Sequence, residues 1–166
     1  LAPFFTNAEL ADPNYDPEDL VPAYVKSGSK VGGRRGYLSG PTDALYGVPF
    51  GAETSIMAYR KDIFEKHGLE VPTTYDELIE VASFITENEE GVYGMTSRGA
   101  SNHQIVHGWL LHASPFGANI FDDEWNVTVD SPEAKAATEA LKAIIDNSPP
   151  GVTSWGFGEQ ANAFLQ

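Results

Sequence analysis

The chain has 166 residues, 42% of them hydrophobic, and a formal net charge of -14 at pH 7. This length and composition indicate a packed globular protein rather than a disordered one. The negative charge opposes binding to nucleic acid or to an anionic membrane surface, and the absence of cysteine excludes thiolate metal sites, a thiol nucleophile and disulfides.

The first 45 residues are predicted to form short helices and a loop. Residues 1–5 suit either a short helix or coil. Asp16 directly before Pro17 predicts an N-cap followed by the first helical position. The glycine-rich, basic segment 30–40 lacks the spacing of a phosphate-binding P-loop, so a plain loop is expected there.

Two strands and two helices are expected next. Alternating side chains predict strands at residues 44–50 and 54–59, with the carboxylate of Glu53 between them. Residues 61–67 form a predicted helix that ends at Gly68 in a left-handed conformation. Thr74 and Glu77 have the spacing of a capping box, which predicts a helix that ends near Asn88.

The rest of the chain continues this alternation. A strand is predicted at residues 92–97, a helix at 102–113, a small hairpin at 121–129 and a helical pattern at 158–166. The helix at 102–113 is expected to bury Ile105, Val106, Trp109 and Leu110. Ser131 and Pro132 start another helix, whose predicted core stripe is Ala137, Leu141, Ile144 and Ile145. Strands alternating with helices predict an α/β layered fold.

The sequence provides weak support for metal binding or catalysis. His103 and His107 are four residues apart on a predicted helix, with His112 further on, but the HExxH context of a zinc site is absent. Adjacent carboxylates such as Asp122 and Asp123 are typical of solvated turns rather than of the separated pair that glycoside hydrolysis needs. We predict no catalytic residue, metal or cofactor, and a carbohydrate-active hydrolase domain is the alternative.

Four residues have the chemistry of a site for a sugar or polyol, which needs polar partners for hydroxyl groups and flat aromatic faces for C–H surfaces. They are Glu53, Arg98, Asn102 and Trp155, each in a loop or at the end of a predicted strand. Each has a plainer alternative role: a surface charge for Glu53, a salt bridge for Arg98, a helix N-cap for Asn102 and core packing for Trp155.

Several segments also resemble, in order and spacing, one known family. They are Tyr46 to Phe64, KDIFEKHGL at 61–69, VPTTYDEL at 71–78, GVYGM with Arg98-Gly99 at 91–99, FGANIFDD at 116–123, SPEA at 131–134, PPGV at 149–152 and FGEQANAF at 157–164. This series is similar to the extracellular solute-binding proteins of bacterial ABC importers for sugars and polyols, the maltose-binding-protein-like family.

The resemblance implies a periplasmic-binding-protein-like (type II) fold, in which two α/β lobes, each a mixed sheet layered by helices, enclose the solute. Residues 1–45 would end the first lobe and approach the hinge, and residues 46–166 would form the second, C-terminal lobe, truncated at its C-terminal end. Glu53 would be the hinge-strand carboxylate, Arg98 and its loop would touch the ligand, and Trp155 would lie at or beside an aromatic position facing the cleft.

The same resemblance implies a carrier and not an enzyme. The protein would bind a sugar or polyol between its lobes and deliver it to the permease subunits of an ABC transporter. It would be extracytoplasmic, periplasmic or lipid-anchored, with the leader absent from this chain. As a fragment, it is expected to bind its ligand weakly or not at all and to self-associate through surfaces exposed by truncation. A third hypothesis is an interaction module whose acidic face meets a basic partner.

Overall fold

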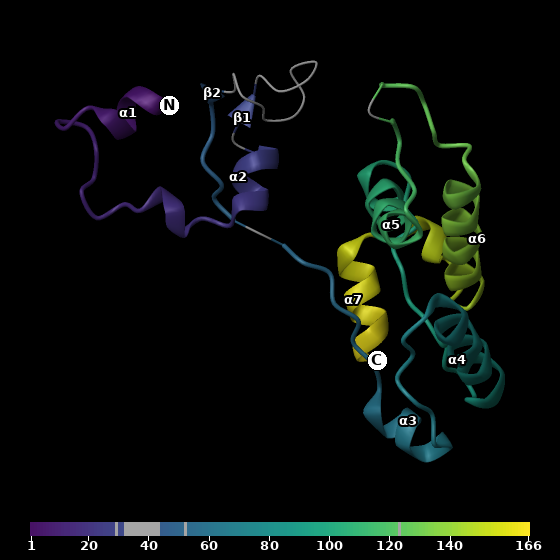
Figure 1. The fold of residues 1–166 in the computed structure, drawn as a ribbon. Coiled ribbons are helices and arrows are strands. Elements are labelled where there is room, and N and C mark those ends of the chain that lie inside the picture. Colours follow the sequence, from purple (N-terminus) through teal and green to yellow (C-terminus); the bar gives the residue numbers. More distant parts are fainter. Residues whose placement is uncertain (29, 32–43, 52, 123) are drawn as a thin grey trace. The chain divides into compact units, whose positions relative to one another are not determined.

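The structure is a computed structural model that describes residues 1–28, 30–31, 44–51, 53–122 and 124–166 (Figure 1). The chain forms two compact units, Leu1–Ile56 and Met57–Gln166. Most of the loop predicted at residues 30–40 lies outside the described residues. Each unit has its own local packing, which the capping residues and apolar side chains explain.

The first unit consists of short elements. They are α1 (Ala2–Thr6), the 3-10 helix η1 (Pro17–Asp19), α2 (Pro22–Gly28), β1 (Lys30–Val31) and β2 (Ala44–Leu45). The two strands pair antiparallel, with Lys30 opposite Leu45. Asp16 is the predicted N-cap, since its carboxylate accepts a 2.9 Å hydrogen bond from the Glu18 amide, but the helix it starts is a single 3-10 turn.

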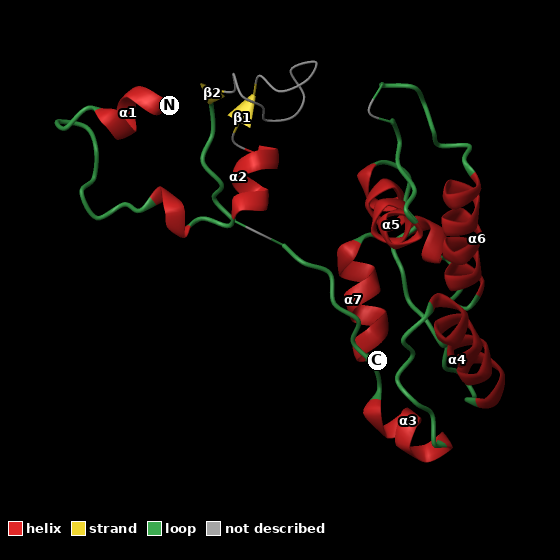
Figure 2. Ribbon diagram, in the orientation of Figure 1, coloured by secondary structure: helices red, strands yellow, loops and turns green. Residues whose placement is uncertain are grey.

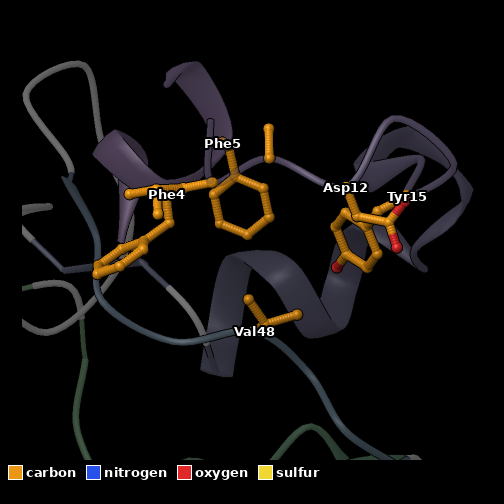
Figure 3. A pocket seen from close by; sticks show the side chains of 7 residues that line it. Phe4, Phe5, Asp12, Tyr15 and Val48 are labelled. Carbon is orange, nitrogen blue, oxygen red and sulfur yellow. The ribbon is translucent and has the colours of Figure 1, made fainter. Parts of the chain in front are cut away.

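An open cavity of about 370 Å³ lies on the first unit (Figure 3). Its lining includes Phe4, Phe5, Asp12, Tyr15 and Val48. The rings of Phe5 and Tyr15 are 5.6 Å apart and tilted by 36°. The Asp12 carboxylate accepts a 2.9 Å hydrogen bond from the Asn14 amide in the same turn. The other residues that line the cavity are mainly aromatic and aliphatic.

The second unit is helical (Figure 2). Its elements are α3 (Lys61–His67), α4 (Tyr75–Asn88), α5 (His103–Ala113), η3 (Ser114–Phe116), α6 (Pro132–Asp146), η4 (Val152–Ser154) and α7 (Phe157–Leu165). Helix α6 packs against both α5 and α4 (Figure 1). Within the described ranges, no helix is both long enough and apolar enough to cross a membrane.

The predicted helix ends are confirmed where capping residues specify them. Gly68 ends α3 with φ 64°, which is a left-handed conformation that glycine adopts without strain. At α4, the Thr74 hydroxyl accepts from the Glu77 amide at 3.2 Å, and the Glu77 carboxylate accepts from the Thr74 amide at 3.2 Å. Ser131 caps α6 by accepting from the Ala134 amide at 3.2 Å. Local side-chain to backbone bonds therefore determine these boundaries.

The core of α6 agrees with the predicted stripe, and that of α5 agrees in part, since Ile105 and Trp109 are half-buried. Ala137, Leu141 and Ile144 are buried, and Ile145 is half-buried. On α5, however, Val106 and Leu110 are 52% and 44% exposed. The buried cluster consists of Ala113, Ala118, Ala134 and Ala137, with Trp109 and Phe116 packed against it. Helices that meet through alanines approach closely, and Trp109 packs beside this contact whereas Val106 and Leu110 do not.

The predicted strands are mostly wrong. In the described residues, only 44–45 of the segment 44–50 is a strand, 54–59 has no regular structure, and 92–97 is an extended segment without a strand partner. Its amides bond elsewhere: Gly94 N donates to Thr86 Oγ1 at 2.9 Å, and Met95 N donates to the Asn147 carbonyl at 3.0 Å. An extended segment becomes a strand only where a second one pairs with it.

The predicted hairpin is reduced to its smallest form. A single antiparallel bridge joins Phe121 to Val127, and Asp123 lies outside the described residues. Between them the Asp122 carboxylate accepts from the amides of Glu124 and Asn126 at 2.9 and 2.8 Å. These bonds close a turn without extending the ladder, so this segment adds no sheet to the described part of the chain.

A tyrosine–histidine pair between α4 and α5 predicts acid sensitivity. The Tyr75 hydroxyl lies 2.9 Å from His112 Nδ1. Burial lowers the pKa of His112, so the folded protein favours the neutral ring. The unfolded chain takes up a proton near the ordinary histidine pKa of about 6.5, and stability therefore falls as pH falls below that value.

We expect urea unfolding to give a smaller free energy of unfolding at about pH 5.5 than at about pH 7.5. The uptake of one proton on unfolding changes this free energy by at most ~1.4 kcal/mol per pH unit, and the loss should stay below that limit. His112→Gln should remove most of the difference. His107→Gln is the matched control, because His107 is an exposed histidine on the same helix. Equal pH dependence in the His112 variant and the unmodified chain would contradict this assignment.

Candidate functional site

The loop that follows the extended segment 92–97 is bound to the residues that precede α7. The amides of Gly99 and Ala100 both donate to the Trp155 carbonyl, at 3.1 and 3.0 Å. A Cβ added to Gly99 would lie 2.7 Å from both the Thr153 Cα and the Val152 carbonyl oxygen. Only glycine allows this close backbone approach, which brings Arg98 and Trp155 to the same part of the second unit.

Arg98 is half-buried and held on two sides by residues of α7. Its Nε donates to the Gln160 side-chain oxygen at 3.1 Å, and its guanidinium carbon lies 5.3 Å from the centre of the Phe157 ring. In the described part of the chain, no carboxylate lies within ion-pair distance of this guanidinium. The salt bridge considered as an alternative role is therefore not observed among these residues.

Asn102 has an unusual backbone and caps α5. Its φ of 85° and ψ of -150° are values that side-chain-bearing residues rarely adopt. Its side-chain oxygen accepts from the Gln104 amide at 3.2 Å, so the N-cap role considered for this residue is confirmed. Asn102 is exposed, which leaves its amide group accessible to a ligand as well.

Trp155 is half-buried, and its surroundings include residues that the sequence did not single out. A Cβ added to Gly151 would lie 3.6 Å from the indole nitrogen. Nearby, the side-chain oxygen of Gln104 is buried without a hydrogen-bond partner in the described residues. A Cβ added to Gly156 would lie 3.5 Å from the Gln104 side-chain nitrogen, so the start of α7 lies against the start of α5.

The start of α7 is held by its own carboxylate. Glu159 accepts a hydrogen bond from the Gly156 amide at 2.9 Å. Hydrogen bonds from the backbone amides of Glu159 itself and of Gly156 lower the pKa of this carboxyl. The helix that presents Phe157 and Gln160 to Arg98 is thus fixed at its first turn.

The other predicted residues lie elsewhere. Glu53 belongs to the first unit, where it is exposed and its carbonyl accepts from the Tyr24 hydroxyl at 3.3 Å. His103 Nε2 lies 3.0 Å from the Gln104 side-chain nitrogen, and His112 bonds to Tyr75. Among the described residues, no group of three or more metal-ligating side chains is found. The structure brings Arg98, Asn102 and Trp155 into one region of the second unit, whereas Glu53 belongs to the first unit.

Sequence reasoning missed Phe157, Gln160 and Gln104 as members of this region. Phe157 and Gln160 are three residues apart on α7, which places them on one helix face. That spacing was available in the sequence, but the position of Arg98 opposite this face was not. The Phe157 ring and the Gln160 amide become part of this region only because they contact Arg98, which lies about 60 residues earlier in the chain.

Comparisons with known proteins agree on one group. The family profile described as "Bacterial extracellular solute-binding protein" matches residues 3–166. A mannitol-binding protein of Pseudomonas aeruginosa is 34% identical over 91% of this chain and 33% of the relative. An erythritol/L-threitol-binding protein of Mycolicibacterium smegmatis is 26% identical over 98% of this chain and 34% of the relative. The chain thus spans about a third of the length of these relatives.

Solved structures give the same result for the fold. An ABC transporter solute-binding protein from Agrobacterium radiobacter K84, in complex with ribitol, superposes with a TM-score of 0.60 and 28% identity over 65% of this chain and 27% of that chain. Maltose-bound MalE3 of T. maritima superposes with a TM-score of 0.56 and 37% identity, over 65% of this chain and 28% of that chain. The matched part has the backbone arrangement of a portion of these proteins.

Proposed function

The chain belongs to the family of bacterial extracellular solute-binding proteins, and on this premise we propose that it is part of the solute-binding component of an ABC importer for a sugar or polyol. Members of this family bind solutes and are not enzymes, so the hydrolase alternative has no support. Relatives named for mannitol and for erythritol/L-threitol, and a similar structure in complex with ribitol, favour a linear polyol.

The observation that most supports this proposal is that the loop between Arg98 and Asn102 is bonded through its backbone to Trp155. A half-buried cation, an exposed amide and a half-buried indole supply hydrogen-bond donors, an acceptor and an apolar face. Polyol hydroxyls both donate and accept, and the C–H groups between them pack on aromatic surfaces. The loop that positions these groups is fixed by two backbone bonds to Trp155, so little ordering is needed on binding.

We also propose the lobe assignment. Residues 1–45 would end a first lobe and residues 46–166 would form a second lobe, with Glu53 at the hinge and the extended segment 92–97 as a strand of a mixed sheet in the complete lobe. The support for this proposal is family membership, since two lobes are what the resemblance to this family implies. Hinge closure around a ligand is the general behaviour of periplasmic binding proteins, and a solute that bridges two lobes favours the closed state.

The proposed partners are the polyol and the permease subunits of the importer, in an extracytoplasmic location. Self-association of this chain is a further proposal. Its support is the exposure of large apolar residues on the second unit, for example Val106, Phe157 and Leu165, which are 52%, 66% and 80% exposed. Apolar surface of this kind favours association in water.

Titration with polyols, followed by NMR, tests the proposed function on this chain. We expect ribitol or D-mannitol to shift the amide signals of residues 98–102 and the indole signal of Trp155, with a Kd of about 1 mM or weaker, which corresponds to ~4 kcal/mol of binding free energy. Weak binding is expected because a single lobe supplies only one wall of the proposed cleft, and each missing hydrogen bond removes roughly 0.5–1.5 kcal/mol.

Glutamine, which is polar but is not a polyol, serves as the control solute and should cause no saturable shift. Saturable shifts that cluster elsewhere would contradict the proposed site, and no saturable shift with any polyol would contradict binding by this chain. Maltose added to the protein should remain intact in the NMR spectra, because a binding protein does not hydrolyse it. Signals of a new sugar product would instead support the hydrolase alternative.

A further inference from the structure

The guanidinium of Arg98 donates a hydrogen bond from Nε to Gln160, and its terminal edge, formed by Nη1 and Nη2, is available. A guanidinium has one N–H on Nε and two on each terminal nitrogen. The Nε–H is used by the Gln160 oxygen at 3.1 Å, and the Phe157 ring lies beside the group at 5.3 Å. A cation at this distance from a ring is attracted to its face. Among the described residues, Nη1 and Nη2 have no hydrogen-bond partner, so this terminal pair remains for a ligand.

The two residues that hold Arg98 belong to a helix that is itself tied to the Arg98 loop. Phe157 and Gln160 lie on one face of α7, three residues apart. Trp155, just before α7, accepts from Gly99 and Ala100, just after Arg98. The side chain is therefore anchored through its own Nε and through the backbone of the next two residues. This double attachment restricts the direction in which the guanidinium can point.

Both partners are neutral. An amide and a ring orient the guanidinium without cancelling its charge, whereas a glutamate in place of Gln160 would pair with it. The free fork has the geometry that matches two neighbouring oxygens. A carboxylate or phosphate would fit this fork, but the chain has a net charge of -14, which disfavours an anionic ligand. Two adjacent hydroxyl oxygens satisfy the fork without adding negative charge.

We propose that Gln160 and Phe157 are positioning residues that make Arg98 present only its Nη1–Nη2 edge, which binds a vicinal diol of the ligand. This inference rests on the proposed function for the identity of the ligand. The orientation of Arg98 does not depend on that function, and it can be measured without any ligand.

The first test observes Arg98 directly. The Arg98 Nε–H signal in a nitrogen-15 NMR spectrum is assigned by its absence in Arg98→Lys. We expect slow exchange of this proton with water in the unmodified chain and fast exchange in Gln160→Ala. Gln160→Glu should restore slow exchange, since a carboxylate oxygen also accepts from Nε. Asn162→Ala is the matched control, because Asn162 is an exposed amide residue of the same helix, and it should leave the exchange unchanged.

The second test measures ligand affinity. Gln160→Ala should weaken ribitol binding about three- to tenfold, because a side chain released from one orientation must be ordered on binding. The unmodified chain should prefer ribitol to pentane-1,3,5-triol, which has the same carbon chain but no adjacent hydroxyls. This preference should shrink in Gln160→Ala and persist in Asn162→Ala.

Unchanged Nε–H exchange in Gln160→Ala would overturn the positioning role. Equal affinity for ribitol and pentane-1,3,5-triol in the unmodified chain would overturn the assignment of a vicinal diol. If no polyol binds to the unmodified chain, the assignment of a diol-binding site to this chain fails, and the exchange measurement alone decides whether Gln160 positions Arg98.

Discussion

Replacing Gly94 with alanine should lower the free energy of unfolding of the second unit by about 3 kcal/mol, near the upper end of the usual cost of overpacking. A Cβ at this position would lie 1.9 Å from the Ala82 carbonyl oxygen and 2.5 Å from the Ala82 carbonyl carbon. Ala82 is 2% exposed in the middle of α4, so neither backbone can move aside without disturbing the core.

Gly94→Ala should also weaken the hydrogen bonds that join segment 92–97 to α4 and to the end of α6. Gly94 N donates to Thr86 Oγ1 on α4, and Met95 N donates to Asn147 at the end of α6. Pushing residue 94 away from α4 would lengthen both bonds. The predicted loss of stability therefore combines a steric clash with weakened hydrogen bonds.

Tryptophan fluorescence during urea unfolding measures this effect selectively, because Trp109, Trp125 and Trp155 are the tryptophans of the chain and all lie in the second unit. Gly158→Ala is the control, since a Cβ there has no neighbouring atom within 4 Å. Alanine is favoured over glycine in a helix, so this control should be neutral or more stable by up to ~1 kcal/mol. A Gly94 variant as stable as the Gly158 variant would contradict the close contact with α4.

Replacing Arg98 with alanine should weaken polyol binding about tenfold to a hundredfold. Hydrogen bonds from a charged donor contribute about 1.5–3 kcal/mol, and each ~1.4 kcal/mol is a factor of ten in affinity. Since the unmodified chain is expected to bind in the millimolar range, the variant should give no saturable shift in the NMR titration with ribitol.

The effect on stability should be small by comparison, because the guanidinium is only half-buried and its partners are an amide and a ring. Arg60→Ala is the matched control. Arg60 is the described arginine of the same unit that pairs with a carboxylate, at 2.6 Å from Asp62, and its removal changes the net charge equally. If both arginine variants bind ribitol as well as the unmodified chain does, Arg98 is not part of the ligand site.

The helices show how much of the fold could be predicted locally. Thr74 with Glu77, Ser131 with Pro132, and Gly68 each specify a boundary through bonds or conformations within four residues of chain, and all three boundaries are confirmed. Family membership was also predicted from ordered motifs and is confirmed by the match to residues 3–166.

The strands and the buried face of α5 could not be predicted in the same way. An alternating pattern favours an extended backbone, but pairing depends on a neighbour that is often distant in the sequence, and residues 92–97 lack one within the described chain. On α5 the large residues Val106 and Leu110 were expected inside. Gly108 and Ala113 are buried instead, because close helix contact favours small side chains there.

The sequence by itself determined the helix boundaries, the family and three residues that the structure places in one region, because caps and motifs act over a few neighbouring positions. Only the tertiary structure decided that Gln160 and Phe157 of α7 contact Arg98, and that Gly94 and Gly99 are positions where two backbones nearly touch. These are contacts between distant segments, and their energy depends on atomic separations that no local pattern encodes.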